Sequence, residues 1–183
     1  GIRGGIEQEE HPILGQCGWQ DAWKAYAYAP DFWSSYYYAS AAARMAYCLR
    51  TIRPDLAGEY RASAEKAFVW AENAYAEGLE KEGHKWTRRA HAGARQEREN
   101  AACDLFRLTL NPEYERVYLS IRTEGNHDAA FVYATLPNGV GDEGIKRACM
   151  ESIVKTAETA LANGNRLPYR LTSENMSTER VTG

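Results

Sequence analysis

The feature that most constrains this chain is the alternation of two kinds of helical segment along its 183 residues. One kind, typified by residues 34–52, is apolar on nearly every side. The other kind, typified by residues 54–76, repeats apolar residues at i, i+3 and i+4 and carries charges on its opposite side. Because this order occurs three times and strand patterns are almost absent, the sequence predicts an all-α fold.

Local capping and stop patterns set the expected boundaries. The predicted helices span residues 34–52, 54–76, 96–110, 112–121, 127–136 and 142–162. Ser34 or Ser35 is an expected N-cap, and Gly78 is an expected C-terminal stop. A charged linker is predicted at 80–89, and an Asn-Gly pair is expected to end the last helix. The polar segment 165–183 is predicted to be an extended connection.

The two kinds of helix also predict how the chain is layered. A helix that is apolar on all sides needs cover on all sides, whereas an amphipathic helix needs it on one. Stacked antiparallel hairpins satisfy both when the apolar helices form an inner layer and the amphipathic ones an outer layer. Three hairpins form an arc whose two open ends leave apolar surface uncovered unless more chain closes the ring. We therefore expect residues 1–183 to be one segment of a helical ring.

The charge balance argues against some classes of partner. The chain has 22 Lys and Arg against 25 Asp and Glu, a net charge of −3 and a pI near 5.9. This balance favours neither nucleic acid nor an anionic membrane as a partner. No apolar run approaches the ~20 residues that span a bilayer.

The four cysteines are Cys17, Cys48, Cys103 and Cys149, and they lack the close spacing of a zinc site. Three of them lie in apolar helical pattern, which is typical of small buried thiols. An even number is also compatible with a disulfide in an exported protein. The sequence is therefore compatible with either state.

Several stretches resemble glycoside hydrolase family 9. They are GGIEQEEHP (4–12), APDFWSSYYYASAAARMAYCLR (29–50), AEKAFVWAENAYAEG (64–78) and QERENAACDLFRLTLNPEYERVYL (96–119). In that family a Ser-Ser-aromatic start leads an alanine-rich helix, and an A-x-x-A-x-x-W-A helix follows, which here is Ala64, Ala67, Trp70 and Ala71. The fourth stretch matches the next family block at Glu97, Ala101, Ala102, Leu105, Thr109 and Tyr114. It departs from that block at Gln96 and Asn100, where the family has Asp and Trp.

The resemblance implies a fold and an activity. The fold would be an (α/α)6 toroid of six helical hairpins, of which three hairpins are about half. The activity would be inverting hydrolysis of β-1,4-glucan by two carboxylates, as in a cellulase, in a secreted or periplasmic protein. The family's base lies in an Asp-Ala-Gly-Asp motif, which this chain lacks, and its acid follows a later His-containing motif. We therefore assign no catalytic residue and expect no cofactor, with the remainder of the same catalytic domain as a partner.

The stretch WQDAWKAYAYAPDFWSSYYY (19–38) is rich in aromatic residues. Trp and Tyr faces stack on the C–H faces of sugar rings, and nearby polar groups bind the hydroxyls. The residues predicted to contact glucan are Trp19, Trp23, Tyr26, Tyr28 and Trp33. The alternative is that these rings pack a long loop against the helices.

Asp31 and the histidines also have two interpretations each. An acid before a helix is typical of a favourable N-terminal charge, but Asp31 is also a candidate ligand for a sugar hydroxyl. His11 follows Glu9 and Glu10, which suggests either a site or a charged loop. The other histidines are scattered, and solvated or capping roles are expected for His84, His91 and His127.

A calcium site of the family has a counterpart at residues 92–97. Some members bind calcium there through Ser and Gly carbonyls and an Asp-Glu pair. This chain keeps only Gly93 and Glu97 of that set, and Arg95 lies beside Gln96. Because calcium needs several oxygen ligands, we expect no metal here.

Two other functions fit the same helical pattern. One is a different (α/α)6 carbohydrate enzyme, such as a sugar epimerase or an unsaturated glucuronyl hydrolase, which needs its own His or Asp constellation. The other is a non-enzymatic helical scaffold that binds protein partners along its concave face.

Overall fold

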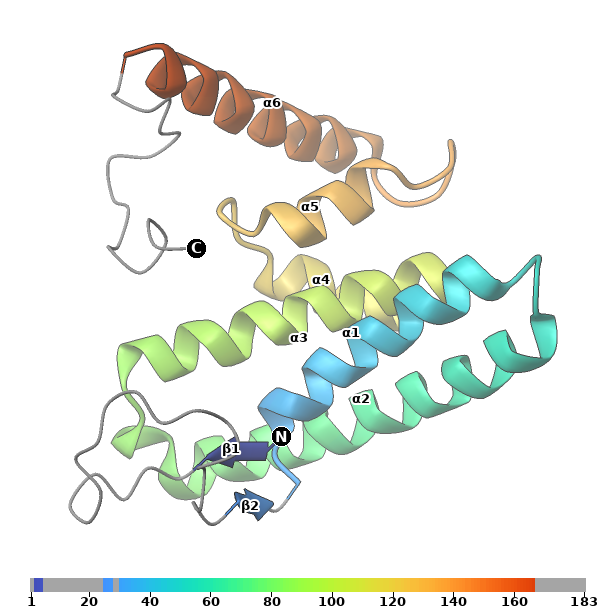
Figure 1. Ribbon diagram of the computed structural model, residues 1–183, viewed down its shortest axis with the longest axis vertical. Helices are drawn as coiled ribbons and strands as arrows, with labels where there is room; N and C mark the ends of the chain where they lie inside the picture. Colours follow the sequence, from blue (N-terminus) through green and yellow to red (C-terminus); the bar gives the residue numbers. More distant parts are fainter. Residues whose placement is uncertain (1, 5–24, 28–29, 167–183) are drawn as a thin grey trace, which may run out of the picture.

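The computed structural model describes residues 2–4, 25–27 and 30–166 (Figure 1). Two short strands, β1 (Ile2–Gly4) and β2 (Ala25–Ala27), pair antiparallel with Arg3 opposite Tyr26. All other regular structure in the described residues is helical, which confirms the predicted all-α fold.

The helices form three antiparallel hairpins. In chain order the described elements are α1 (Phe32–Leu49), α2 (Pro54–Glu82), the 3-10 helix η2 (Gly83–Lys85), α3 (Arg88–Thr109), α4 (Pro112–Ile121), α5 (His127–Ala134) and α6 (Glu143–Arg166). Figure 1 shows that α1, α3 and α5 run in one direction and that α2, α4 and α6 run in the other. The pairs α1–α2, α3–α4 and α5–α6 are therefore the predicted hairpins.

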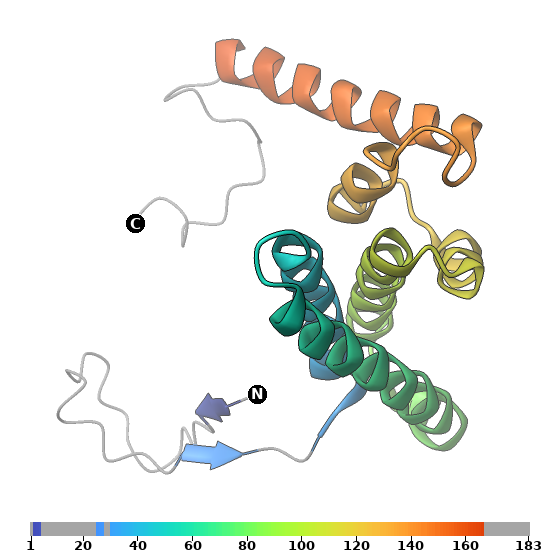
Figure 2. The same cartoon turned by 90° about the vertical axis from the view of Figure 1, so that its right-hand side faces the viewer.

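The odd-numbered helices form a continuous row. Helix α3 packs against α1 on one side and α5 on the other, and each even-numbered helix packs on the odd-numbered helix of its own hairpin (Figure 2). Within the described residues, α1 and α5 contact no odd-numbered helix other than α3. The row is thus open at both ends, and the closed toroid stays a prediction.

Small residues allow the helices of this row to approach closely. The fully buried alanines among the described residues are Ala39, Ala43 and Ala46 of α1, Ala64 and Ala71 of α2, Ala94, Ala101 and Ala102 of α3, and Ala129 of α5. Larger side chains fill the space between them, including the fully buried Tyr36, Leu105, Tyr118 and Tyr133. Alanine at the contact positions favours the short end of the usual interaxial distance of about 8–10 Å.

Helix α1 is less buried than its composition predicts. It was expected to be covered on most sides, but Tyr37 is 65% exposed and Met45 is 46% exposed. Among the elements that the structure describes, only α2 and α3 pack on it, and they leave one side of α1 uncovered. For the same reason Cys48 is exposed, whereas Cys103 and Cys149 are buried as predicted. These three cysteines are free thiols, and Cys17 lies outside the described residues.

Several helices begin or end at residues other than those predicted. Helix α1 begins at Phe32 because the Asp31 carboxylate, not Ser34 or Ser35, caps it by accepting from the Ser34 N–H at 2.7 Å. Helix α2 continues past Gly78. A Cβ at that position would lie 3.1 Å from the Trp86 ring, so the glycine permits close packing and does not end the helix.

The predicted linker at 80–89 is largely helical. Helix α3 begins at Arg88, and the Thr87 hydroxyl caps it by accepting from the Ala90 N–H at 3.1 Å. Helix α6 also runs through Asn163 and Gly164 to Arg166, because a glycine inside a helix costs only about 1 kcal/mol.

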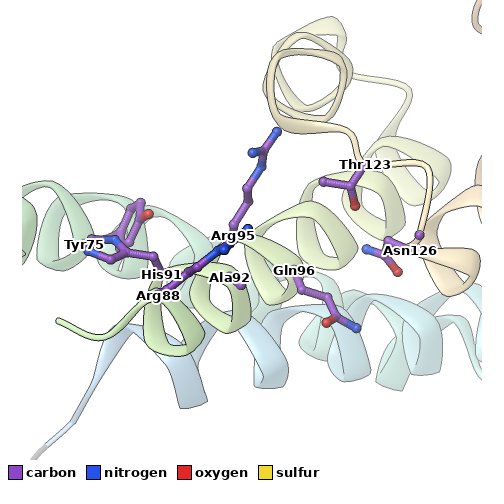
Figure 3. Close-up of a pocket in the computed structure, with 9 residues that line it drawn as sticks. Tyr75, Arg88, His91, Ala92, Arg95, Gln96, Thr123 and Asn126 are labelled. Atoms are coloured by element: carbon purple, nitrogen blue, oxygen red, sulfur yellow. The ribbon is translucent and has the colours of Figure 1, made fainter. Parts of the chain in front are cut away.

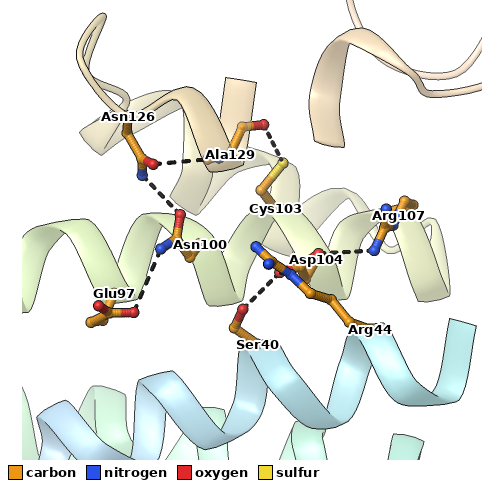
Figure 4. A network of polar contacts seen from close by, with 9 residues as sticks. All are labelled: Ser40, Arg44, Glu97, Asn100, Cys103, Asp104, Arg107, Asn126 and Ala129. Carbon is orange, nitrogen blue, oxygen red and sulfur yellow. Dashed lines mark hydrogen bonds and ion pairs between the residues drawn. The ribbon is translucent and has the colours of Figure 1, made fainter. Parts of the chain in front are cut away.

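A buried polar network joins α1 to α3 (Figure 4). The Asp104 carboxylate accepts from the Ser40 hydroxyl at 2.7 Å and from Arg44 Nε at 2.7 Å, both on α1. It also accepts from Arg107 Nη2 at 3.0 Å within α3. The Asp104 side chain is fully buried, and burial raises its pKa although both guanidinium groups oppose that rise. The network fixes the lateral register of the two helices.

Candidate functional site

One rim of the hairpin row gathers the segments that precede the odd-numbered helices. Helices α1, α3 and α5 begin on the same side of the molecule (Figure 1). The connection from α2 to α3 contains η2 and Trp86, and the connection from α4 to α5 spans residues 122–126. Side chains that are far apart in the sequence therefore meet at this rim.

Four rings form an aromatic cluster at the rim, made of Phe32, Tyr75, Trp86 and His91. The Phe32 ring centroid lies 5.1 Å from that of Trp86 and 5.2 Å from that of Tyr75. Trp86 stacks on Tyr75 at 6.0 Å, and His91 lies 5.2 Å from Trp86. His91 Nε2 donates to the Gly83 carbonyl oxygen at 3.1 Å, which fixes the imidazole ring. The cluster joins the ends of α1, α2 and α3.

Beside this cluster lies a pocket of about 550 Å³, which we call the rim pocket (Figure 3). Its volume falls within the roughly 300–1,000 Å³ of small-molecule sites. Helix α3 lines it with Arg88, His91, Arg95 and Gln96, since residues at i, i+3, i+7 and i+8 share one helical face. Tyr75 of α2 and the 122–126 connection complete the wall.

Two buried side chains of α3 hold the connection that closes the pocket. The Glu99 carboxylate accepts from the Thr123 N–H at 3.2 Å and from the Thr123 hydroxyl at 3.0 Å. Asn100 Oδ1 accepts from Asn126 Nδ2 at 2.9 Å, and Asn126 in turn caps α5 (Figure 4). Burial raises the pKa of Glu99, against the hydrogen bonds from Thr123. Thr123 and Asn126 both line the pocket, so this wall is fixed before a ligand binds, which lowers the cost of binding.

An ion pair stabilises the wall that Tyr75 belongs to. Two of the guanidinium nitrogens of Arg98, Nε and Nη2, each donate to the Glu72 carboxylate at 2.6 Å. The Tyr36 hydroxyl donates to the same carboxylate at 2.6 Å. Burial, followed by the hydrogen bond to Glu72, raises the pKa of Tyr36. The charge of Glu72 is therefore satisfied by Arg98 and Tyr36.

Asp31 and Trp33 are the residues predicted to bind sugar whose side chains the structure describes, and neither lines the rim pocket. Trp19, Trp23 and Tyr28 lie outside the described residues, and Tyr26 lies in β2. The Asp31 carboxylate accepts from both the N–H and the hydroxyl of Ser34, so its contacts are those of a helix cap. Trp33 is 38% exposed and its ring packs on Gly93 of α3. Of the two interpretations given to Trp33, packing against a helix describes its contacts here.

Sequence reasoning missed the residues that do line the pocket. Arg88 fell within the predicted linker, and a solvated or capping role was expected for His91. The signal in the sequence that could have identified them is Thr87, a residue type that is favoured at the N-cap of a helix. A helix that begins after Thr87 places residues 88, 91 and 95 on one face.

Substitution of Gly93 tests the packing of the Trp33 ring on α3. A Cβ at Gly93 would lie 2.2 Å from Cη2 of Trp33, so Gly93→Ala is expected to displace the indole ring. Gly58→Ala in α2 is the matched control, because no atom lies within 4 Å of a Cβ there. We expect Gly93→Ala to be about 2 kcal/mol less stable than Gly58→Ala in urea unfolding, with a shifted tryptophan emission. Equal stabilities and unchanged emission would contradict this packing.

The stretch matched to the family's calcium site lies inside α3. Residues 92–97 are helical, so their carbonyl oxygens point along the helix toward N–H groups four residues later. Arg95 Nε donates to the Ile121 carbonyl oxygen at 2.9 Å, which brings a cation to the same place. Within the described ranges, no group of three or more His, Cys, Asp and Glu is placed to hold a metal ion.

Two comparisons of the sequence found no match. No family of known proteins matches this chain, and no curated protein is similar to it in sequence.

None of the helices between residues 30 and 166 combines the length and apolar character needed to cross a bilayer.

Proposed function

We propose that this chain is part of a carbohydrate-active helical toroid of the glycoside hydrolase family 9 type. In this proposal it supplies scaffold and part of the saccharide-binding rim of a hydrolase that acts on β-1,4-glucan by inversion. The main observation in support is the rim pocket, where aromatic rings adjoin hydrogen-bonding groups at the start of three parallel helices. Aromatic faces suit the C–H faces of a sugar ring, and amide, hydroxyl and guanidinium groups suit its hydroxyls.

Exposed apolar stripes support the proposal that further chain completes the ring. The stripe on α1 contains the exposed Trp33, Tyr37, Ala41, Met45 and Cys48, and the stripe on α6 contains the exposed Met150, Val154, Ala157 and Leu161. These helices belong to the first and last hairpins, which are the two ends of the row. Exposed contiguous apolar surface marks an interaction site. We propose that the remainder of the same catalytic domain covers both stripes.

The proposal assigns the catalytic carboxylates to that remainder. The intact protein would act outside the cytoplasm, secreted or periplasmic, where polymeric glucan is met. The described residues would orient the glucan, and the network around Glu99 and Asn100 would keep the rim in place.

Titration with cello-oligosaccharides tests the proposal. Trp86 touches Tyr75 and His91 of the pocket wall, so binding should change tryptophan fluorescence at millimolar sugar or below. Gln96 lines the pocket, and Gln96→Ala should weaken binding about fivefold through the loss of about 1 kcal/mol of hydrogen bonding. Trp70→Phe removes an exposed tryptophan away from the pocket and should leave the affinity unchanged.

Two outcomes would overturn this proposal. Absence of a fluorescence change at millimolar sugar would favour a protein-binding scaffold. Hydrolysis of soluble β-glucan by the isolated chain, with inversion, would show that the catalytic groups lie within it.

A further inference from the structure

We infer that the rim pocket binds the carboxylate of an acidic saccharide, a uronate-type unit, in preference to a neutral glucose unit. This inference rests on the saccharide-binding part of the proposed function, and for this pocket it replaces a neutral glucose unit by an acidic sugar unit as the ligand. The starting observation is the charge of the lining. Arg88, His91 and Arg95 line the pocket, and no Asp or Glu among the described residues does, although the chain as a whole carries a net charge of −3.

Two acids close to the pocket, Glu72 and Glu99, are engaged elsewhere. Glu72 accepts both nitrogens of Arg98 and the Tyr36 hydroxyl. Glu99 is fully buried behind Thr123 and accepts two hydrogen bonds from it. Arg95 is close enough to Glu99 to counter part of the rise in that carboxyl's pKa. The positive charge of Arg95 is therefore partly balanced by Glu99. Arg88 forms no ion pair with any described residue.

Hydrogen-bond donors remain available on the charged wall. Arg95 uses Nε for the Ile121 carbonyl, and its two Nη groups make no hydrogen bond within the described residues. Figure 3 shows Arg95 reaching from α3 toward the end of α4. A guanidinium group matches the two oxygens of a carboxylate. The Gln96 amide remains for the sugar hydroxyls, the Thr123 hydroxyl oxygen can still accept from one, and Tyr75 offers an aromatic wall.

The start of α3 adds to the positive potential. Its first turn contains Arg88 and Arg89 and no acid. Cations are disfavoured at this end of a helix, where the backbone dipole is already positive. A bound carboxylate would offset this repulsion.

A matched pair of ligands tests the inference. The probes are a uronate oligosaccharide and the same oligosaccharide with its carboxyl groups reduced to alcohols, each titrated by calorimetry. We expect the uronate to bind at least about tenfold more tightly at low salt, as suits one charge-assisted contact. Its affinity should fall as NaCl rises, whereas that of the reduced sugar should not.

Neighbouring arginines supply a matched pair of variants. Arg88→Ala removes a pocket cation that has no ion pair to lose, and should weaken uronate binding about tenfold while leaving the reduced sugar unaffected. Arg89→Ala makes the same change in net charge one residue further, outside the pocket lining, and should weaken uronate binding by less than about twofold while leaving the reduced sugar unaffected.

The outcomes separate this inference from the proposed function. Equal binding of the two sugars, with no effect of Arg88→Ala, would overturn the inference and leave saccharide binding intact. Binding of neither sugar would overturn both. Inorganic phosphate that competes with the uronate at equal affinity would show a general anion site and also overturn the preference for a sugar acid.

Discussion

Asp104→Ala is expected to lower the free energy of unfolding by about 3 kcal/mol. The substitution leaves the Ser40 hydroxyl and Arg107 without their acceptor. The Arg107 side chain is only 15% exposed, so its charge becomes a largely buried, unpaired cation. Removal of one partner from a buried ion pair costs about 3–5 kcal/mol. We expect the lower end, because Arg44 is 41% exposed and water can replace its contact.

Urea unfolding followed by circular dichroism measures this loss. Glu113→Ala is the matched control, because it breaks an ion pair with Arg116 in which both side chains are well exposed. Exposed pairs contribute at most about 1 kcal/mol, so the control should stay near the wild type. A loss for Asp104→Ala no greater than that of the control would show that the network does not stabilise the fold.

The pH dependence of the same variant separates burial from ion pairing. Because burial raises the pKa of Asp104, the native state binds its proton more tightly than the unfolded state does. The wild-type unfolding free energy should therefore fall as pH rises from the ordinary carboxyl pKa of about 4 to the raised native pKa. Asp104→Ala lacks this contribution, so the variant's deficit should shrink over that window. A deficit that grows with pH would mean that the attraction of Arg44 and Arg107 outweighs burial and lowers the pKa of Asp104 in the native state.

Gly141→Ala is expected to cost about 3 kcal/mol of unfolding free energy. Gly141 has φ 75°, where a side chain costs roughly 1–2 kcal/mol. A Cβ there would also lie 2.8 Å from the Tyr133 hydroxyl oxygen. That tyrosine is fully buried, donates to Glu115 at 2.5 Å and accepts from the Asp142 N–H at 2.9 Å. Because it cannot move without breaking both bonds, the clash adds about 1–2 kcal/mol.

Gly139→Ala isolates the steric part of this cost. Gly139 has φ 78°, but no atom lies within 4 Å of a Cβ there. Its substitution should cost only the backbone part, roughly 1–2 kcal/mol. Thermal unfolding of both variants measures the difference. Equal losses would mean that Tyr133 has room to shift.

Local sequence patterns determined much of the fold. The alternation of apolar and amphipathic segments predicted six helices in three hairpins, and each is present. Helix α4 has the bounds predicted for it, because Asn111 as N-cap and Pro112 at the first turn act within a few residues. The predicted arc of three hairpins also left apolar surface uncovered at its two ends, and exposed apolar side chains lie there on α1 and α6. The pattern of α1 taken alone predicted cover on most sides of that helix.

Only the tertiary structure decided where the pocket lies and which residues line it. Gly78 read alone is a helix stop, but the Trp86 ring packs on it and α2 continues. The pocket unites Tyr75, Arg88, Arg95 and Thr123 from three parts of the chain. Capping and periodicity act over a few residues, whereas a pocket depends on contacts between helices whose spacing and register the whole core sets. For that reason the sequence by itself determined the kinds of helix and their order, and packing alone determined which of their faces form a site.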